Sequence, residues 1–329
     1  MIFAIIFFVV GLVVLIKGAD FLVSGASSLS LKLKISPIVI GLTIVAFGTS
    51  SPELLVSVTS ALQGKTDLAL GNVVGSNISN ILVILGISSI IYPLKVQKNT
   101  VWKEIPMSFL AAIMMVILGI QTILDNPNNP LSTVFKSGQV GYLTFTNGLV
   151  LLAFFIVFMY YTFGIAKTEA DNGSDIKEMS IPKSVVFMVL GLIGLGFGST
   201  LLVDNAITLA QTFGLSDAFI GLTLVAFGTS LPELATSVQA ALKKQVDLAV
   251  GNVVGSNIFN IFLILGITAM VKPIPVSGQS LIDIGVLFLA TIFMFIALFV
   301  GVKHRLGRVE GIIMLVLYVS YIVYLLYRG

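Results

Sequence analysis

A block of 48 residues occurs twice in this chain, at positions 180 residues apart. Residues 40–87 align with residues 220–267 without a gap, and 34 of the 48 pairs are identical. Similarity of this degree within one chain indicates a duplicated structural unit. Because the chain is 57% hydrophobic and only 10% charged, the duplicated unit is expected to fold inside a membrane.

The hydrophobic residues are gathered in stretches long enough to cross the roughly 30 Å hydrocarbon core of a bilayer as α-helices. Ten such stretches lie near residues 2–26, 36–62, 68–92, 103–122, 143–165, 183–210, 217–242, 247–271, 280–302 and 308–327. We therefore predict an all-α integral membrane protein with ten transmembrane helices in two five-helix repeats. The first repeat covers 1–165, with its α-repeat at 36–92; a linker follows at 166–181, and the second repeat covers 182–329, with its α-repeat at 217–271.

Basic residues are unevenly distributed between the two sets of loops. The loops after odd-numbered spans hold Lys32, Lys34, Lys95, Lys98, Lys103, Lys167, Lys177, Lys183, Lys243, Lys244, Lys303, Arg305 and Arg308. The opposite side holds only Lys65, Lys136, Lys272 and Arg328. Since positively charged loops stay in the cytoplasm, both termini are predicted outside and the linker inside. Five spans per half is an odd number, so the second repeat is expected to be inverted.

Each copy of the block carries a glutamate at membrane depth, where a charge costs about 2.5–3.5 kcal/mol on insertion scales. The first lies in Ala46-Phe-Gly-Thr-Ser-Ser-Pro-Glu53 and the second in Ala226-Phe-Gly-Thr-Ser-Leu-Pro-Glu233. Pro52 has no N–H for the preceding turn, so we expect the helix to kink or break there. Carbonyl groups from Ala46 to Gly48 are then predicted to lose their partners, which membrane depth tolerates only in a cavity or against a ligand.

The hydroxyl groups of Thr49 and Ser50 lie four and three residues before Glu53, a spacing that predicts one shared helix face. The same spacing recurs at Thr229, Ser230 and Glu233. Together the halves would offer carboxylates, hydroxyls and carbonyls, and such an all-oxygen set suits hard cations such as Ca²⁺ and Na⁺. The alternative is a proline-kinked helix whose hydroxyls bind its own backbone, but this leaves the duplicated glutamate unexplained.

A second motif runs from Gly71 to Asn80 and recurs from Gly251 to Asn260. Polar residues four apart form a stripe on one helix face in each copy: Asn72, Ser76 and Asn80, and Asn252, Ser256 and Asn260. We predict that Ser76, Asn80, Ser256 and Asn260 bind the cation, although helix–helix hydrogen bonding is an alternative role. The glycines, including Gly75 and Gly255, are expected to serve close helix packing. Asn77 and Asn257 point off the stripe and rank below it.

Other features bound the range of functions. The chain has no cysteine, which excludes disulfides, thiolate metal sites and cysteine nucleophiles. Lys17 and Asp20 stand three residues apart in the first span, and this spacing predicts that they pair with each other. The single histidine, His304, lies in a predicted basic loop. An intramembrane protease would need a serine–histidine or paired-aspartate site in the membrane, and a channel would need a continuous pore.

The paired G-T-S-x-P-E and G-N-V-V-G-S-N motifs resemble the α-repeats of the sodium/calcium exchanger family. The resemblance implies that Glu53 and Glu233 are the central Ca²⁺ ligands and are shared with Na⁺. It implies further oxygens from Thr49, Ser50, Thr229, Ser230, Ser76, Asn80, Ser256, Asn260 and the carbonyls of Ala46 and Ala226. The first and sixth spans would slide across this core. Ca²⁺ and Na⁺ are then substrates in a lipid bilayer, with no cofactor, nucleic acid or obligatory protein partner.

Two positions distinguish branches of that family. Many relatives, including potassium-dependent ones, carry aspartate where this chain has Asn260, so a requirement for K⁺ is not expected. The proton-coupled branch has a second glutamate where Gly75 and Gly255 stand. The resemblance therefore favours a secondary antiporter that exchanges Na⁺ for Ca²⁺ by alternating access. The alternatives are K⁺-coupled or H⁺-coupled Ca²⁺ exchange, and more remotely a cation channel or an intramembrane protease.

Overall fold

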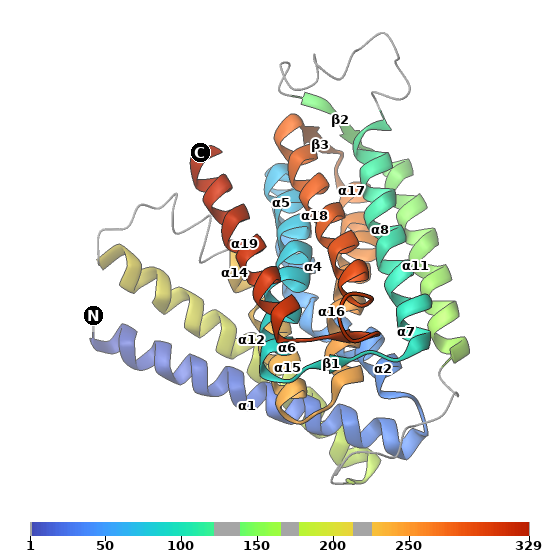
Figure 1. The fold of residues 1–329 in the computed structure, drawn as a ribbon. Helices are drawn as coiled ribbons and strands as arrows, with labels where there is room; N and C mark the ends of the chain where they lie inside the picture. The colour runs from blue at the N-terminus through green and yellow to red at the C-terminus, as the bar shows by residue number, and fades with distance from the viewer. Residues whose placement is uncertain (1, 122–138, 166–177, 213–225, 329) are drawn as a thin grey trace.

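The computed structural model describes residues 2–121, 139–165, 178–212 and 226–328, and these are mainly helical (Figure 1). The helices of the first half are α1 (Ile2–Leu33), α2 (Pro37–Ile40), α3 (Ala46–Thr49), α4 (Ser51–Leu62), α5 (Thr66–Ser79), α6 (Gly86–Ile91), α7 (Lys98–Trp102), α8 (Glu104–Gly119) and α11 (Phe145–Ile165). Those of the second half are α12 (Ile181–Thr212), α14 (Ala226–Gly228), α15 (Leu231–Leu242), α16 (Val246–Ile258), α17 (Gly266–Val271), α18 (Gly278–Ala297) and α19 (Arg308–Arg328).

Among the described residues, three π-helical segments continue these helices inside the duplicated blocks. They are η1 (Gly41–Val45), η2 (Asn80–Leu85) and η4 (Phe259–Leu265). Single π-helical turns within α-helices are frequent at functional sites, because the extra residue redirects the side chains around it. Two of the three segments begin at or next to a predicted ligand, since η2 starts at Asn80 and Asn260 is the second residue of η4.

Nine of the ten predicted spans have a counterpart in the described residues. Eight helices are long and apolar enough to cross a membrane, and a ninth span is formed by the bent pair Pro37–Thr49 and Ser51–Leu62. The predicted span at 217–242 is described only from Ala226 onward, so the count of ten extends outside the described residues. The predicted linker 166–181 lies largely outside the described residues, because residues 166–177 are not described. Its last residue, Ile181, is already the first residue of α12.

The helices α1 and α12 lie against each other as a layer that slants across the remaining bundle (Figure 1). Gly11, Gly18 and Gly25 stand seven residues apart on α1 and face the α12 backbone directly. A Cβ atom built on Gly11 would lie 2.7 Å from the backbone nitrogen of Leu202, and one on Gly25 would lie 2.6 Å from the carbonyl oxygen of Ser184. As the residue number rises along α1, the number of the residue it contacts on α12 falls. The two helices are therefore antiparallel, and their backbones are in direct contact.

The two copies of the second motif form the centre of the bundle. In the spans Thr66–Ile91 and Val246–Val271, 78% and 83% of the residues in the most apolar window are buried, against 11–44% in the other continuous spans. A Cβ atom on Gly251 would lie 2.7 Å from the carbonyl oxygen of Ile38, and one on Gly255 would lie 2.8 Å from Ala46 Cβ. The packing role predicted for these two glycines is therefore confirmed, and it brings α16 against the first block. For Gly71 and Gly75 the same prediction is wrong, because a Cβ atom at either position would meet nothing within 4 Å.

Two short antiparallel sheets were not predicted from the sequence. Strand β1 (Leu94–Lys95) pairs with β4 (Arg305–Leu306), and β2 (Gln139–Leu143) pairs with β3 (Ile274–Ser277). Strands of two to five residues are too short for alternating hydrophobicity to be recognised in a sequence. Each sheet joins one loop from the first half to one from the second, and the two sheets lie at opposite ends of the bundle (Figure 1).

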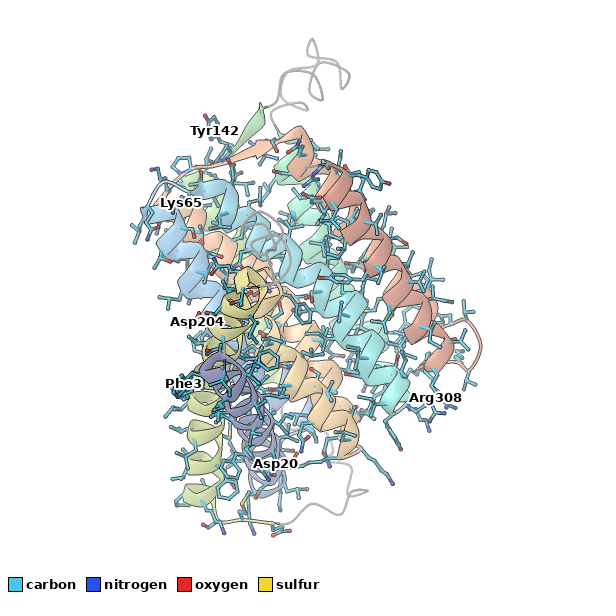
Figure 2. All side chains as sticks on the ribbon, turned by 90° about the vertical axis from the view of Figure 1, so that its left-hand side faces the viewer. Phe3, Asp20, Lys65, Tyr142, Asp204 and Arg308 are labelled. Atoms are coloured by element: carbon cyan, nitrogen blue, oxygen red, sulfur yellow. The ribbon has the colours of Figure 1, made fainter. Side chains whose placement is uncertain are left out.

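The outer layer is tied to the bundle by Asp20 of α1 (Figure 2). Lys243, at the end of α15, reaches Asp20 with its Nζ 2.6 Å from Oδ1, and it also donates to Ser24 Oγ at 2.7 Å. Gln239 Nε2 donates to the same Asp20 oxygen at 2.9 Å. The predicted pair of Lys17 with Asp20 is wrong, because the carboxylate turns toward α15 while Lys17 is exposed.

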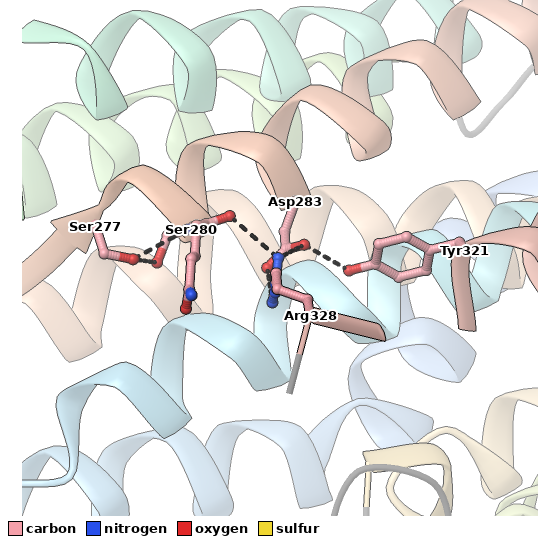
Figure 3. A network of polar contacts seen from close by, with 6 residues as sticks. Ser277, Ser280, Asp283, Tyr321 and Arg328 are labelled. Carbon is pink, nitrogen blue, oxygen red and sulfur yellow. Dashed lines mark hydrogen bonds and ion pairs between the residues drawn. The ribbon is translucent and has the colours of Figure 1, made fainter. Parts of the chain in front are cut away.

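The last helix is held by a separate polar contact with α18 (Figure 3). The Arg328 guanidinium binds Asp283 through two contacts, Nη1 to Oδ1 at 2.8 Å and Nη2 to Oδ2 at 3.0 Å. Tyr321 donates its hydroxyl to Asp283 Oδ1 at 3.0 Å. Paired N–H···O bonds of this kind fix orientation as well as distance, so they hold the end of α19 on α18.

Candidate cation-binding site

The predicted helix break is confirmed, and it lies at Ser50. Helix α3 ends at Thr49 and α4 begins at Ser51, with a bend of 44° between the two arms. Ser50 has φ −84° and ψ 5°, and Ser230 has φ −86° and ψ 3°, so both copies leave helical geometry at the same residue. Pro52 then occupies the first turn of α4, where a missing N–H costs no helical bond.

The carbonyl groups of Ala46 and Gly48 keep partners, so for these two the prediction that they lose them is wrong. The Ala46 carbonyl accepts the Ser50 N–H at 2.9 Å and Thr49 Oγ1 at 3.3 Å. The Gly48 carbonyl, which would have needed the N–H that Pro52 lacks, accepts Ser51 Oγ at 2.8 Å instead. Ala226 is the first residue of α14.

Glu53 and Glu233 are both buried, with exposed fractions of 0% and 1%. Each lies in the first turn of its helix, α4 or α15, where the helix dipole and free N–H groups favour a negative charge. Ser50 Oγ donates to Glu233 Oε1 at 2.8 Å, and Ser230 Oγ donates to Glu53 Oε1 at 3.5 Å. The hydroxyls therefore serve the glutamate of the other half. That they share a helix face with their own glutamate stays a prediction.

Two asparagines at the start of the polar stripes complete the contact between halves. Thr49 Oγ1 donates to Asn252 Oδ1 at 3.0 Å, and Thr229 Oγ1 donates to Asn72 Oδ1 at 3.3 Å. Asn72 Nδ2 in turn donates to Ser57 Oγ at 3.0 Å and to the Glu53 carbonyl at 3.3 Å. Asn252 makes the matching pair of bonds in the second half. Both asparagines lie on the predicted polar stripes, but no role was predicted for them. Their occurrence at equivalent positions in both copies is the sequence signal that could have identified them.

The remaining predicted ligands lie along α5 and α16 on the same stripes. Ser76 Oγ lies 3.4 Å from Glu53 Oε1 and 3.2 Å from Ser230 Oγ. Ser256 is fully buried. Asn80 lies one helical turn beyond Ser76, and Asn260 lies one turn beyond Ser256; both are buried, and each donates its amide nitrogen to an asparagine of the other half.

Several buried oxygen atoms of this cluster have no hydrogen-bond donor among the described residues. They are Glu53 Oε2, Glu233 Oε2, Asn80 Oδ1, Asn260 Oδ1 and Ser256 Oγ. A buried polar atom without a partner costs about 1–3 kcal/mol, so five in one cluster need a common explanation. These five atoms include one oxygen of each carboxylate, and oxygens of this kind are the ligands that Ca²⁺ and Na⁺ select. One nitrogen of the neighbouring asparagines, Asn257 Nδ2, also has no partner among the described residues. Within the described residues, no group of three acidic, histidine or cysteine side chains could hold a metal ion.

Comparison with known proteins agrees with this geometry. The family model described as "Sodium/calcium exchanger protein" matches residues 3–164 and 183–327. The putative antiporter CaxA of Alkalimonas amylolytica is 41% identical over 328 residues, which cover 98% of both chains. The sodium/calcium exchanger MaX1 of Methanosarcina acetivorans is 32% identical over 342 residues, covering 96% of this chain and 97% of the relative.

The fold also matches that of a solved exchanger. The structure of the sodium-calcium exchanger NCX_Mj superposes with a TM-score of 0.82 at 33% identity, covering 98% of this chain and 99% of that one. Fold and site thus define a multi-pass membrane transporter of cations. The chain belongs to the sodium/calcium exchanger family, which consists of ion antiporters and not of enzymes and needs no cofactor.

Proposed function

We propose that this protein exchanges Na⁺ for Ca²⁺ across the cell membrane by alternating access to one central site. The observation that carries the proposal is the pair of glutamates, one from each half, each with one oxygen bound by a hydroxyl and the other without a donor. Two buried carboxylates repel each other in a medium of low dielectric constant. One Ca²⁺ or several Na⁺ ions would neutralise them, so the site favours movement only when it is loaded with either ion.

The proposed ligands are the residues named from the sequence. Glu53 and Glu233 supply the charges, and Asn80, Asn260 and Ser256 supply oxygens that have no donor in the described residues. The other members are Thr49, Ser50, Ser76, Thr229, Ser230 and the carbonyl groups of Ala46 and Ala226. The Ala46 carbonyl accepts the Ser50 N–H at 2.9 Å, and the single Thr49 proton is shared between this carbonyl at 3.3 Å and Asn252 Oδ1 at 3.0 Å. The carbonyl could bind a cation with that proton directed at Asn252.

An inverted arrangement of the halves 1–165 and 182–329, joined by the linker 166–181, is part of the same proposal. The hydrogen bonds at the site occur in pairs with the halves exchanged, as in Ser50 with Glu233 and Ser230 with Glu53. The short strands also occupy equivalent positions in the two halves. The repeat offset of 180 residues carries β1 (94–95) onto residues 274–275 of β3, yet β1 and β3 belong to sheets at opposite ends of the bundle. A two-fold axis in the membrane plane accounts for both patterns. The basic loops then place both termini outside.

Reconstituted vesicles provide the test. Vesicles loaded with Na⁺ and diluted into Na⁺-free medium should accumulate Ca²⁺, and uptake should saturate and vanish when the Na⁺ gradient is collapsed. Replacement of K⁺ by choline should leave the rate unchanged, because Asn80 and Asn260 give the site only two carboxylates. Uptake that follows a pH gradient alone would overturn Na⁺ coupling, a strict K⁺ requirement would favour the potassium-coupled alternative, and flux without a countergradient would point to a channel.

A further inference from the structure

We propose that Asn77 and Asn257, which the polar stripe leaves aside, are positioning residues that turn the oxygens of Asn260 and Asn80 toward the transported cation. The inference rests on the proposed function, since it names how that same site is kept ready for its ion. Neither residue needs to touch the ion. Each acts through an asparagine that belongs to the other half of the protein.

The four asparagines form a buried cluster between the two halves. Their exposed fractions range from 0% to 2%. Asn80 Nδ2 donates to Asn257 Oδ1 at 3.0 Å, and Asn260 Nδ2 donates to Asn77 Oδ1 at 3.0 Å. The nitrogens of Asn80 and Asn260 are therefore engaged away from the site, while their oxygens have no donor among the described residues.

The orientation of one pair is fixed by a backbone group. The two ends of an asparagine amide have nearly the same shape, so hydrogen bonding alone decides which end points where. Asn77 Nδ2 lies 3.4 Å from the backbone carbonyl of Asn257, and a carbonyl can only accept. The nitrogen of Asn77 must face it, which leaves Asn77 Oδ1 for Asn260. The nitrogen of Asn260 then faces Asn77, and its oxygen is left for the site.

A rotation of the Asn260 amide by 180° would be doubly unfavourable. It would set the Asn260 oxygen against Asn77 Oδ1, and it would direct an NH₂ group at a cation. Outer partners that hold a metal ligand in orientation in this way are common in metal sites. Asn257 Oδ1 accepts from Asn80 Nδ2 at 3.0 Å, but Asn257 Nδ2 has no partner among the described residues, so the backbone anchor that fixes Asn77 has no counterpart in this pair.

A purely structural network would be expected to use all of its polar atoms. Here the oxygens of Asn80 and Asn260 and the amide nitrogen of Asn257 have no partner among the described residues, and each is left buried at a cost in free energy. A bound cation would offset the cost of the two oxygens, although not that of the nitrogen. The two oxygens are why we assign the cluster to ligand positioning and not to helix association.

A double-mutant cycle separates the two roles. Asn77→Ala, Asn260→Ala and the double variant are compared by the Ca²⁺ concentration that gives half-maximal Na⁺-driven uptake, and by the rise in Tm of the purified protein on titration with Ca²⁺. Asn77→Ala should raise the half-saturating concentration about tenfold, the lower end of what loss of an outer partner costs in metal affinity, with the maximal rate kept. The double variant should be no worse than Asn260→Ala alone.

Ser88→Ala is the matched control, because Ser88 is fully buried on the continuation of the same span and its hydroxyl has no partner among the described residues. It should leave both measurements unchanged. If Asn77→Ala does not fold, Asn257→Ala paired with Asn80→Ala tests the same relation. Additive effects, or unchanged Ca²⁺ affinity in a folded variant, would overturn the inference. The Tm titration needs no gradient, so a wild type that binds Ca²⁺ but ignores Na⁺ would refute only the proposed coupling.

Discussion

At the scale of single residues, the site depends on side chains that are far apart in the sequence. Ser50 donates to Glu233, 183 positions away, and Thr49 donates to Asn252, 203 positions away. In this arrangement the Ser50 hydroxyl binds the glutamate of the other half and not the one in its own half. A substitution in one copy of the motif should therefore impair the ligand shell of the other copy as well.

Substitution of either glutamate by glutamine should nearly abolish Ca²⁺ exchange. In Glu53→Gln and Glu233→Gln the amide keeps the shape but removes a charge that a divalent ion requires. We expect uptake to fall by roughly a hundredfold or more, since loss of an outer partner alone costs 10–100-fold. Neutralising a buried acid in a membrane span does not by itself threaten the fold. Na⁺-driven ⁴⁵Ca²⁺ uptake in vesicles measures the effect.

Glu104→Gln is the control for that comparison. Glu104 is also buried, with 2% exposed, and one of its oxygens has no donor in the described residues, while the other accepts the Tyr161 hydroxyl at 2.7 Å. It lies at the start of α8, outside the site. Its variant should transport Ca²⁺ normally. Normal transport by a well-expressed Glu53 or Glu233 variant would remove that glutamate from the proposed ligands.

The sequence predicted which residues lie in the candidate site but not which of them form hydrogen bonds with each other. Motif spacing identified Glu53, Ser50 and Ser76 because a buried charge beside a proline is rare enough to be informative. Spacing could not predict that Ser50 donates to Glu233, because that glutamate lies on another helix, 183 positions away. The role of Asn77 could not be predicted either, since its partner Asn260 lies on another helix.

At the scale of helices, the outer layer of α1 and α12 packs on the bundle largely through apolar side chains: Leu22 of α1, Val45 of η1 and Leu248 of α16 belong to one buried cluster. The glycines of α1 recur at seven-residue intervals and bring its backbone against α12. Ser184 Oγ donates to Ser28 Oγ at 3.0 Å near one end of the pair. The contact of α1 with α15 is of another kind, because it includes an ion pair of Asp20 with Lys243 whose side chains are about one third exposed. Such a pair contributes only about 0–1 kcal/mol and is therefore easily broken during a sliding movement.

Cross-linking distinguishes movement within the layer from movement against the bundle. A disulfide formed in Ser28→Cys/Ser184→Cys joins α1 to α12 and should leave Na⁺-driven Ca²⁺ uptake intact, if the two helices move together. A short bis-thiol reagent that bridges Asp20→Cys/Gln239→Cys joins α1 to α15 and should stop uptake. The chain has no cysteine of its own, so every cross-link can be assigned.

Reduction of the disulfide, and the unbridged Asp20→Cys/Gln239→Cys protein, are the controls. The unbridged variant lacks the ion pair but should still transport, because that contact belongs to one arrangement of the layer. Loss of uptake on closing the Ser28–Ser184 disulfide would show that α1 and α12 move relative to each other. Full uptake with α1 bridged to α15 would contradict sliding of the layer altogether.

At the scale of the whole molecule, the two short sheets constrain how the halves are oriented. Loops joined by hydrogen-bonded strands must lie on the same side of the membrane, so β1 and β4 share one side and β2 and β3 share the other. The first side carries Lys95, Arg305 and Arg308, and the second carries Lys272. The structure thus groups these loops as the charge count did.

Thiol labelling from each side of the membrane can decide the orientation. Asn99→Cys and Lys303→Cys, one from each half, should react with an impermeant reagent only from the cytoplasm, because positively charged loops are retained there. Tyr142→Cys and Lys272→Cys should react only from outside; Tyr142 is 52% exposed, and all four positions lie on the surface of the bundle. Intact cells and inverted vesicles are labelled in parallel, with Ser88→Cys as the buried control that reacts from neither side. If Asn99 and Lys303 were labelled from opposite sides, the inverted repeat would be ruled out, whereas exchange of all four results would reverse only the orientation of the protein.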